Sequence, residues 1–133
     1  MDSGAFVARF VENDANHEAA LRTLEDVRTQ RLPYRLLFTS NFVIDEVLTF
    51  LLCERGHKDA SQVLRSLRSD PSLRVLHVSE DVEAMADEEF LRFSDQTISY
   101  TDCTTKVLMR EHDISTVFSF DRDFEVMGLI RIP

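Results

Sequence analysis

Short apolar segments alternate with longer amphipathic segments along most of this chain of 133 residues. Periodicity predicts strands at 36–38, 73–78, 116–120 and 129–132, and helices at 16–31, 40–56, 59–69, 81–93 and 99–112. A helix between two strands is a crossover connection, which lets consecutive strands run in the same direction. The alternation therefore predicts an α/β fold in which helices cover both faces of a largely parallel sheet.

The composition fits one domain over residues 1–133. The three glycines and three prolines fall at expected element boundaries, and no stretch has the composition of a linker. The apolar runs are too short to cross a bilayer, and no signal peptide is recognisable, so we expect a cytoplasmic protein with no membrane segment. Cys53 and Cys103 lack partners at metal-ligand spacing, which indicates free thiols.

The formal net charge of −9 argues against a protein that binds nucleic acid through a broad basic surface. An acidic surface is the ordinary way to keep a domain soluble. If the substrate is nucleic acid, a metal ion and a few local cations must supply the positive charge. Lys106, Arg110 and Arg122 are the candidates for contacts with nucleic acid, although each can equally be a solvated surface charge.

Asp121 and Asp123 follow directly after the strand expected at 116–120. Ligands of open parallel sheets bind beyond the carboxyl ends of the strands, which makes this position a candidate site. An aspartate also often begins a turn after a strand, and that explanation stays open. In an extended segment the two side chains would point to the same side, so both are candidates to contact a metal ion.

Glu46 lies on a helix where its neighbours three and four residues away include Phe42 and Phe50. This places a carboxylate on a mainly apolar face of the helix. A buried carboxylate without a partner is costly, so we expect a cation or a hydrogen-bond donor beside it. The alternative is a boundary glutamate whose carboxylate reaches the solvent.

Asp102 and Asp2 complete the set of acidic candidates. The segment from Ser99 to Asp102 matches a helix capping box, and a capping aspartate in the first turn of a helix can still bind a metal ion. Asp2, in MDSGAF, precedes an apolar segment and can be no more than a charged terminus.

The candidate catalytic and metal-binding residues are Asp2, Glu46, Asp102, Asp121 and Asp123. They offer only carboxylate oxygens, which suit Mg²⁺ or Mn²⁺ and do not suit zinc. The four histidines are scattered, and no GxSxG elbow, Walker loop or dinucleotide fingerprint is present.

Four segments resemble the PIN domain family, and within it the VapC-type ribonuclease toxins. They are MDSGAF at 1–6, TSNFVIDEVLTFL at 39–51, SYTDCTTKVLM at 99–109 and VFSFDRDFEVMGL at 117–129. No single segment is specific, but the four occur in the family's order and spacing and cover essentially the whole chain.

The resemblance implies a three-layer α/β/α sandwich on a five-stranded parallel sheet. It also implies Mg²⁺- or Mn²⁺-dependent cleavage of RNA, homodimerisation, and a VapB-type antitoxin that covers the active site. By position, it makes Asp2 the carboxylate of the first strand, Glu46 the helical glutamate and Asp102 the aspartate of the late helix. The closing acid is then Asp121 or Asp123.

Three polar residues lie beside these acids and are candidates to hydrogen-bond to them: Ser3, Asn41 and Ser119. Each can equally belong to an ordinary turn or helix cap. The expected mechanism is metal-assisted hydrolysis, in which a metal-activated water attacks phosphorus and the metal neutralises the developing charge.

The start of the chain departs from the family pattern, because Met1 is the only residue ahead of Asp2. Members of the family normally have several strand residues at this point, and a central strand needs roughly five residues. We therefore expect the first strand to be truncated in this sequence, or to be completed by residues ahead of Met1.

Three other functions compete with the nuclease. A non-catalytic PIN-like module would bind RNA or a partner protein without cutting. A Toprim-like domain would use Asp121-Arg122-Asp123 as its DxD motif, but it would need a glutamate after the first strand. A response-regulator receiver would need a lysine near the end of the last strands, and none follows Phe120.

Overall fold

The computed structural model describes residues 1–133. The helices are α1 (Ser3–Phe10), α2 (His17–Arg28), α3 (Asn41–Arg55), α4 (His57–Ser69), α5 (Glu80–Arg92), α6 (Tyr100–Glu111) and α7 (Asp123–Val126). The strands are β1 (Leu37–Ser40), β2 (Leu73–Leu76), β3 (Thr116–Phe118) and β4 (Ile130–Ile132). None of the helices combines the length and the hydropathy that a bilayer crossing requires.

The strands form two separate parallel pairs, β1 with β2 and β3 with β4. The register places Thr39 opposite Val75 in the first pair and Val117 opposite Arg131 in the second. The predicted α/β fold with parallel pairing is thereby confirmed. The implied count of five strands is wrong for this chain, because the place between β1 and β3 holds two residues rather than a full strand.

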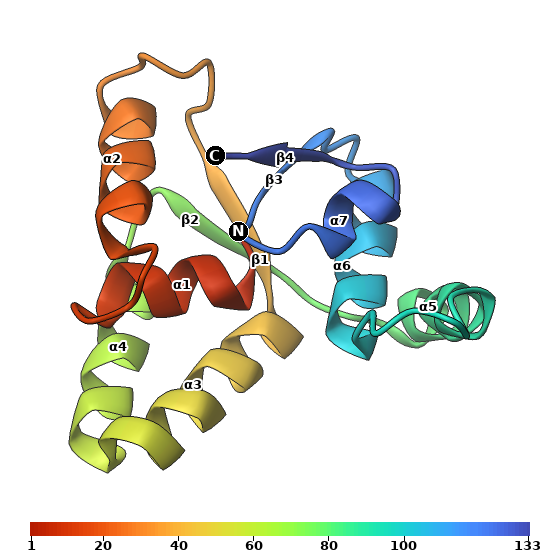
Figure 1. Cartoon of the computed structure of the whole chain (residues 1–133), viewed down its shortest axis with the longest axis horizontal. Coiled ribbons are helices and arrows are strands. Elements are labelled where there is room, and N and C mark those ends of the chain that lie inside the picture. The colour runs from red at the N-terminus through yellow and green to blue at the C-terminus, as the bar shows by residue number, and fades with distance from the viewer.

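Those two residues, Met1 and Asp2, join the strand pairs to each other (Figure 1). The ammonium group of Met1 donates a hydrogen bond to the carbonyl oxygen of Phe38 in β1. The N–H of Asp2 donates to the carbonyl oxygen of Phe118 in β3 at 3.0 Å, and the Thr39 hydroxyl donates to the carbonyl of Met1 at 3.0 Å. Met1 and Asp2 therefore occupy the position of a strand end between β1 and β3.

The helices form two groups, with α1 to α4 on one side of β1 and β2 and α5 and α6 on the other (Figure 1). Phe6 and Leu51 are fully buried in the core of the first group, and Phe124 is fully buried in the core of the second. Successive residues of β3 serve both cores, since Phe118 packs in the first and Val117 in the second. The strands thus lie between two helical layers, as the resemblance implied.

Two helices were not expected from the sequence. The α1 helix begins directly after Asp2, whose side chain accepts a hydrogen bond from the N–H of Gly4. The short α7 helix begins at Asp123, just beyond the strand that was predicted to extend to Phe120. The other predicted elements are present, with ends that coincide or differ by up to three residues.

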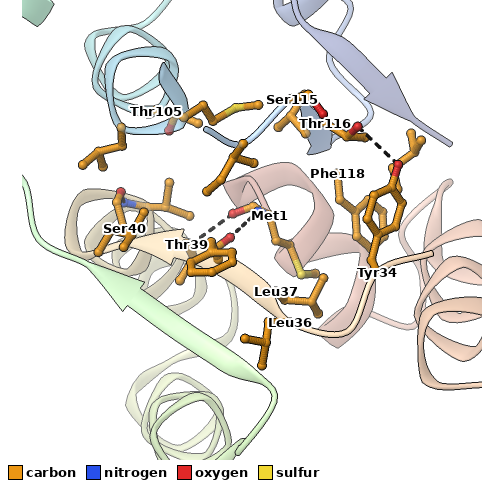
Figure 2. Close-up of a pocket in the computed structure, with 18 of the residues that line it drawn as sticks. Met1, Tyr34, Leu36, Leu37, Thr39, Ser40, Thr105, Ser115, Thr116 and Phe118 are labelled. Carbon is orange, nitrogen blue, oxygen red and sulfur yellow. Dashed lines mark hydrogen bonds between the residues drawn. The ribbon is translucent and has the colours of Figure 1, made fainter. Parts of the chain in front are cut away.

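A cavity of about 250 Å³ lies behind Met1, between β1 and β3 (Figure 2). Its lining is mostly apolar and comes from both strand pairs and from α6, with Leu37, Phe118 and Leu108 among the lining side chains. Met1 and Asp2 therefore bridge the two strand pairs at one end. Beyond these two residues, the cavity separates the pairs.

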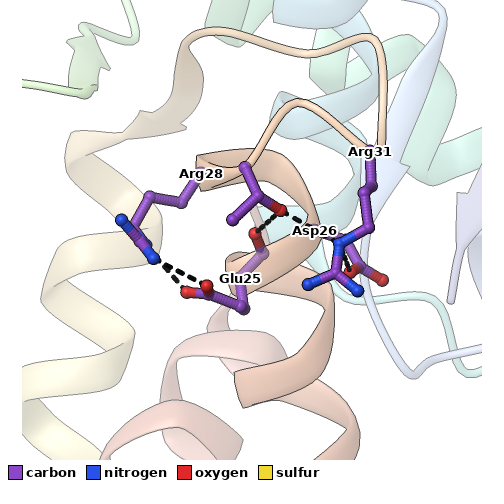
Figure 3. A network of polar contacts seen from close by, with 5 residues as sticks. Glu25, Asp26, Arg28 and Arg31 are labelled. Atoms are coloured by element: carbon purple, nitrogen blue, oxygen red, sulfur yellow. Dashed lines mark hydrogen bonds and ion pairs between the residues drawn. The ribbon is translucent and has the colours of Figure 1, made fainter.

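A network of ion pairs closes the end of α2, well outside this central region (Figure 3). Arg28 pairs with Glu25 at 2.7 Å, and Arg31 pairs with Asp26 at 3.2 Å. These side chains are mostly exposed, where an ion pair contributes little to the free energy of unfolding. The network holds the start of the connection from α2 to β1 and is not part of the candidate functional site.

Replacing Phe6 with alanine should lower the free energy of unfolding by about 3–5 kcal/mol, because the substitution leaves a void in a closed core. Denaturant titration measures the loss. Phe90 is 46% exposed and provides the matched control, since Phe90→Ala should cost less than about 1 kcal/mol. Equal losses in the two variants would contradict the assignment of Phe6 to the core.

Candidate active site

Asp2 is a buried carboxylate at the start of α1, only 4% exposed. Its Oδ2 atom accepts hydrogen bonds from the Ser119 hydroxyl at 2.9 Å and from the N–H of Gly4 at 3.3 Å. Its Oδ1 atom accepts one from the Ser3 hydroxyl at 3.3 Å. These donors offset part of the cost of burying the carboxylate, and they fix the direction in which it points.

Ser119 connects Asp2 to the acids that follow β3. The Ser119 side chain is fully buried, and its hydroxyl accepts a hydrogen bond from the N–H of Asp121 at 3.0 Å while it donates to Asp2. The Asp121 carboxylate in turn accepts the N–H of Asp123 at 2.9 Å and forms the turn that leads into α7. One serine hydroxyl therefore sets the position of Asp121 relative to Asp2.

Asp102 lies in the first turn of α6 and forms the capping box that the sequence predicted. Its Oδ2 atom accepts hydrogen bonds from the N–H and the hydroxyl of Ser99 at 3.0 and 2.6 Å. The Ser99 hydroxyl accepts the N–H of Asp102 at 3.1 Å in return. Both hydrogen bonds to this carboxylate use Oδ2, so the capping role leaves Oδ1 free for a ligand.

Burial raises the pKa of Asp102 from its ordinary 3.8 to about 6. Hydrogen bonds from Ser99 favour the ionised form and act in the opposite direction, while the negative charges of Asp2 and Asp121 raise the pKa further. Three carboxylates from distant parts of the sequence are thus near enough to repel one another. A divalent cation among them would relieve that repulsion.

Glu46 is exposed on α3, so the expectation that it needs a buried partner is wrong. It lines a shallow hollow together with Phe42, Phe50 and Thr101. Thr101 is the chain neighbour of Asp102, and the hollow therefore extends from Glu46 to the first turn of α6. Glu46 therefore shares a hollow with the residue next to Asp102, and none of the three aspartates lines it.

Asp123 and Asn41 have other contacts. The segment around Asp123 is a turn followed by helix, so the assumption that Asp121 and Asp123 share an extended segment is wrong. The charge of Asp121 contributes to the raised pKa of Asp102. Asn41 accepts the N–H of Val78 at 2.8 Å and anchors the segment after β2.

The three cationic candidates differ in their surroundings. Lys106 forms an ion pair with Glu89 at 2.7 Å, and Arg110 donates to the sulfur of Met85 at 3.2 Å, so both side chains help to join α6 to α5. Arg122 is exposed and forms no ion pair. Arg122 is therefore the cation that stands free next to Asp121.

The donor set of Asp2, Asp102 and Asp121 fits a hard cation, because it consists of carboxylate oxygens with uncompensated negative charge. No group of three or more histidine, cysteine, aspartate or glutamate side chains has the mutual spacing of a complete metal site. The chemistry of the three aspartates thus suits Mg²⁺ or Mn²⁺, and their side chains would have to draw closer to coordinate one ion.

The PIN domain family matches residues 1–129, and the chain belongs to this family. Two relatives carry VapC names. The 23S rRNA-specific endonuclease VapC20 of Mycobacterium tuberculosis is 30% identical over 132 residues, which cover 99% of this chain and 95% of that protein. A VapC ribonuclease of Archaeoglobus fulgidus is 25% identical over 132 residues, which cover 98% of this chain and 81% of that protein.

The fold agrees with this membership. The crystal structure of Mycobacterium tuberculosis VapC20, described as a sarcin-ricin loop cleaving toxin, matches with a TM-score of 0.88 at 28% identity. The match covers 98% of this chain and 95% of that one. The predicted resemblance to VapC-type PIN domains is therefore confirmed in both sequence and fold.

Without divalent metal, Asp102 should make the free energy of unfolding decrease as pH rises from 3.8 through about 6. Its folded pKa lies above its ordinary value, so the folded state binds the proton more tightly, and this advantage is lost as the proton leaves. The contribution is at most roughly 3 kcal/mol. Denaturation in EDTA at several pH values should show a weaker decrease for Asp102→Asn. Identical pH profiles for the two proteins would contradict the raised pKa.

Proposed function

We propose that this chain is a divalent-metal-dependent endoribonuclease that hydrolyses RNA phosphodiester bonds. The observation that carries the proposal is the meeting of Asp2, Asp102 and Asp121 at the ends of the central elements. Residues about a hundred positions apart share one electrostatic environment there, at the carboxyl end of β3 where an α/β fold binds its ligands. The names of the VapC relatives support RNA as the substrate.

The metal proposed for this site is Mg²⁺ or Mn²⁺, which when bound supplies a Lewis acid that lowers the pKa of water and neutralises phosphate charge. Asp2, held by Ser119 and Ser3, would be its most rigid ligand. Asp121 is set by the same Ser119 hydroxyl. Asp102 would present Oδ1, and the bound cation would favour its ionised form against the burial that raises its pKa to about 6 in the metal-free chain.

The surface around these aspartates explains how an acidic protein can act on RNA. With a net charge of −9, the chain cannot rely on a general attraction to phosphate. The metal would provide the main positive charge, and Arg122 beside Asp121 would add a local one. The hollow lined by Glu46, Phe42 and Phe50 reaches Thr101, next to Asp102, and would offer a path for a single strand.

The VapC resemblance also supports three proposals about partners and cellular location. We propose that the chain forms a homodimer, that a VapB-type antitoxin covers the aspartates, and that the pair acts in the cytoplasm. An antitoxin that covers the site would place a positively charged side chain against the three carboxylates, because covering carboxylates without a partner charge is costly. A small neighbouring gene for a DNA-binding partner would support the toxin role.

A non-catalytic PIN-like module is the second candidate. One observation favours it: the side chains do not form a complete metal-ligand set. Such a module would bind RNA or protein at the same hollow without cutting. Its binding of RNA or protein would not depend on Mn²⁺.

Incubation with a panel of RNAs and Mn²⁺ should give cleavage that disappears in EDTA. Asp102→Asn should reduce the rate at least ~100-fold, because the loss of a metal ligand removes several kcal/mol of transition-state stabilisation. Asp95 is exposed in a loop, and Asp95→Asn is the matched control, which should retain full activity.

RNA binding without cleavage, unchanged by EDTA, would instead support the non-catalytic module. Cleavage that survives in both EDTA and Asp102→Asn would contradict the metal-dependent mechanism, or would indicate a contaminating nuclease. Repeating the assay with Asp2→Asn separates these two explanations, since a contaminant would cut equally in all variants.

A further inference from the structure

One face of α3 carries an open hollow beside the first turn of α6. The hollow has a volume of about 520 Å³, within the range of roughly 300–1,000 Å³ that small-ligand sites occupy. Its lining on α3 follows the three- and four-residue spacing of a single helix face, and consists of Phe42, Asp45, Glu46, Thr49 and Phe50. All of these except Phe42 are exposed, so the face is open to a ligand.

The hollow contains two phenyl rings in different surroundings. The N-terminal ends of α3 and α6 lie side by side (Figure 1), and the rings of Phe42 and Tyr100 pack there with 6.4 Å between their centroids. The Tyr100 hydroxyl donates to the Asp87 carboxylate at 2.9 Å, which holds this pair in place. Phe50 is 43% exposed and packs against no other aromatic ring. Its free face is a surface on which an unpaired base can stack.

The polar groups of the hollow select against phosphate. The lining includes the carboxylates of Asp45 and Glu46 but no lysine, arginine or histidine. Neither carboxylate forms an ion pair within the chain. Carboxylates repel the RNA backbone, whereas they accept hydrogen bonds from the N–H groups on the edge of an unpaired base. The hollow is therefore complementary to a base rather than to the backbone.

The four RNA bases differ in what their Watson–Crick edges offer to a carboxylate. Guanine presents two neighbouring donors, N1–H and N2–H, which match the two oxygens of one carboxylate in the strong bidentate arrangement. Adenine and cytosine have an amino group beside a ring nitrogen that accepts, and uracil has one N–H between two carbonyls. These acceptors would face a carboxylate oxygen and repel it, so a free carboxylate favours guanine.

We propose that the hollow binds an unpaired guanine of the RNA substrate, which stacks on Phe50 and donates its two N–H groups to the Asp45 carboxylate. Asp45 takes this role because Glu46 is already a candidate for the metal site. The hollow reaches Thr101, the chain neighbour of Asp102, so the bound guanine would lie close to the phosphodiester bond that is cut. This inference rests on the proposed function, since it takes RNA as the ligand, and it adds the base that the site selects.

The test uses hexanucleotides with a methylphosphonate backbone, which carries no charge and cannot be hydrolysed as a phosphodiester. Each is a run of uracils with guanine, hypoxanthine, adenine or uracil at one central position. Hypoxanthine is guanine without the N2 amino group, so it offers one donor in place of two. Fluorescence anisotropy with the full chain in EDTA gives a Kd for each probe.

The guanine probe should bind at least about fivefold more tightly than the hypoxanthine probe. Asp45→Asn should remove this difference, because an amide has one acceptor oxygen and turns its own N–H toward a guanine donor. Glu54 is an exposed acid of α3 outside the hollow, and Glu54→Gln is the matched control that should keep the preference.

Phe50→Leu should weaken the binding of every probe about fivefold or more without changing the preference for guanine, because the ring stacks on any base. Leu52 is 49% exposed on the same helix and lies outside the hollow, so Leu52→Ala should have no effect.

Equal affinity for the guanine and hypoxanthine probes, or a preference that survives in Asp45→Asn, would overturn the proposal. A Phe50→Leu variant that changes the oligomeric state in sedimentation but not the affinity for the probes would assign this face to contacts between copies, and would also overturn it. Because the probes need no metal and cannot be cut, these results are separate from failure of the nuclease proposal, which the RNA cleavage assay decides.

Discussion

The hydrogen bond from the Ser119 hydroxyl to the Asp2 carboxylate joins the start of the chain to the end of β3, across 117 positions of sequence. Both side chains are buried, and a buried carboxylate without donors costs several kcal/mol. The packing that brings β3 beside Met1 therefore also determines where Asp2 points. Asp121 is held by the same hydroxyl, so the acid after β3 depends on this bond as well.

The charge of the site follows from this arrangement. Asp102 meets the negative charges of Asp2 and Asp121 in a partly buried place, and its pKa rises to about 6 mainly because of the burial. The folded chain thus keeps three acids together against their mutual repulsion, which a divalent cation would relieve. With the proposed cation bound, such a site would let a protein with a net charge of −9 approach RNA, since the attraction would come from the ion.

The sequence predicted the alternation of strands and helices well, because hydrophobic periodicity reports directly on which face of each element is buried. It also predicted the capping box at Ser99 and Asp102, since that motif depends only on local bonds. The two alternatives for Glu46 could not be separated from the sequence, because exposure is decided by neighbouring elements that helical spacing does not reveal, and the structure has the exposed one. The turn after β3 was one of two explanations left open, and the Asp121 carboxylate starts it, whereas the short α7 helix was not predicted because four residues show no apolar periodicity.

Electron paramagnetic resonance of Mn²⁺ tests most directly whether the aspartates form one metal centre. The titration should show a single tight site per chain, and Asp2→Asn should weaken it by at least about tenfold, while Asp95→Asn leaves it unchanged. Circular dichroism of each variant confirms that the fold is retained. Equal Mn²⁺ affinity in the original chain and in a folded Asp2→Asn variant would contradict a centre built on Asp2.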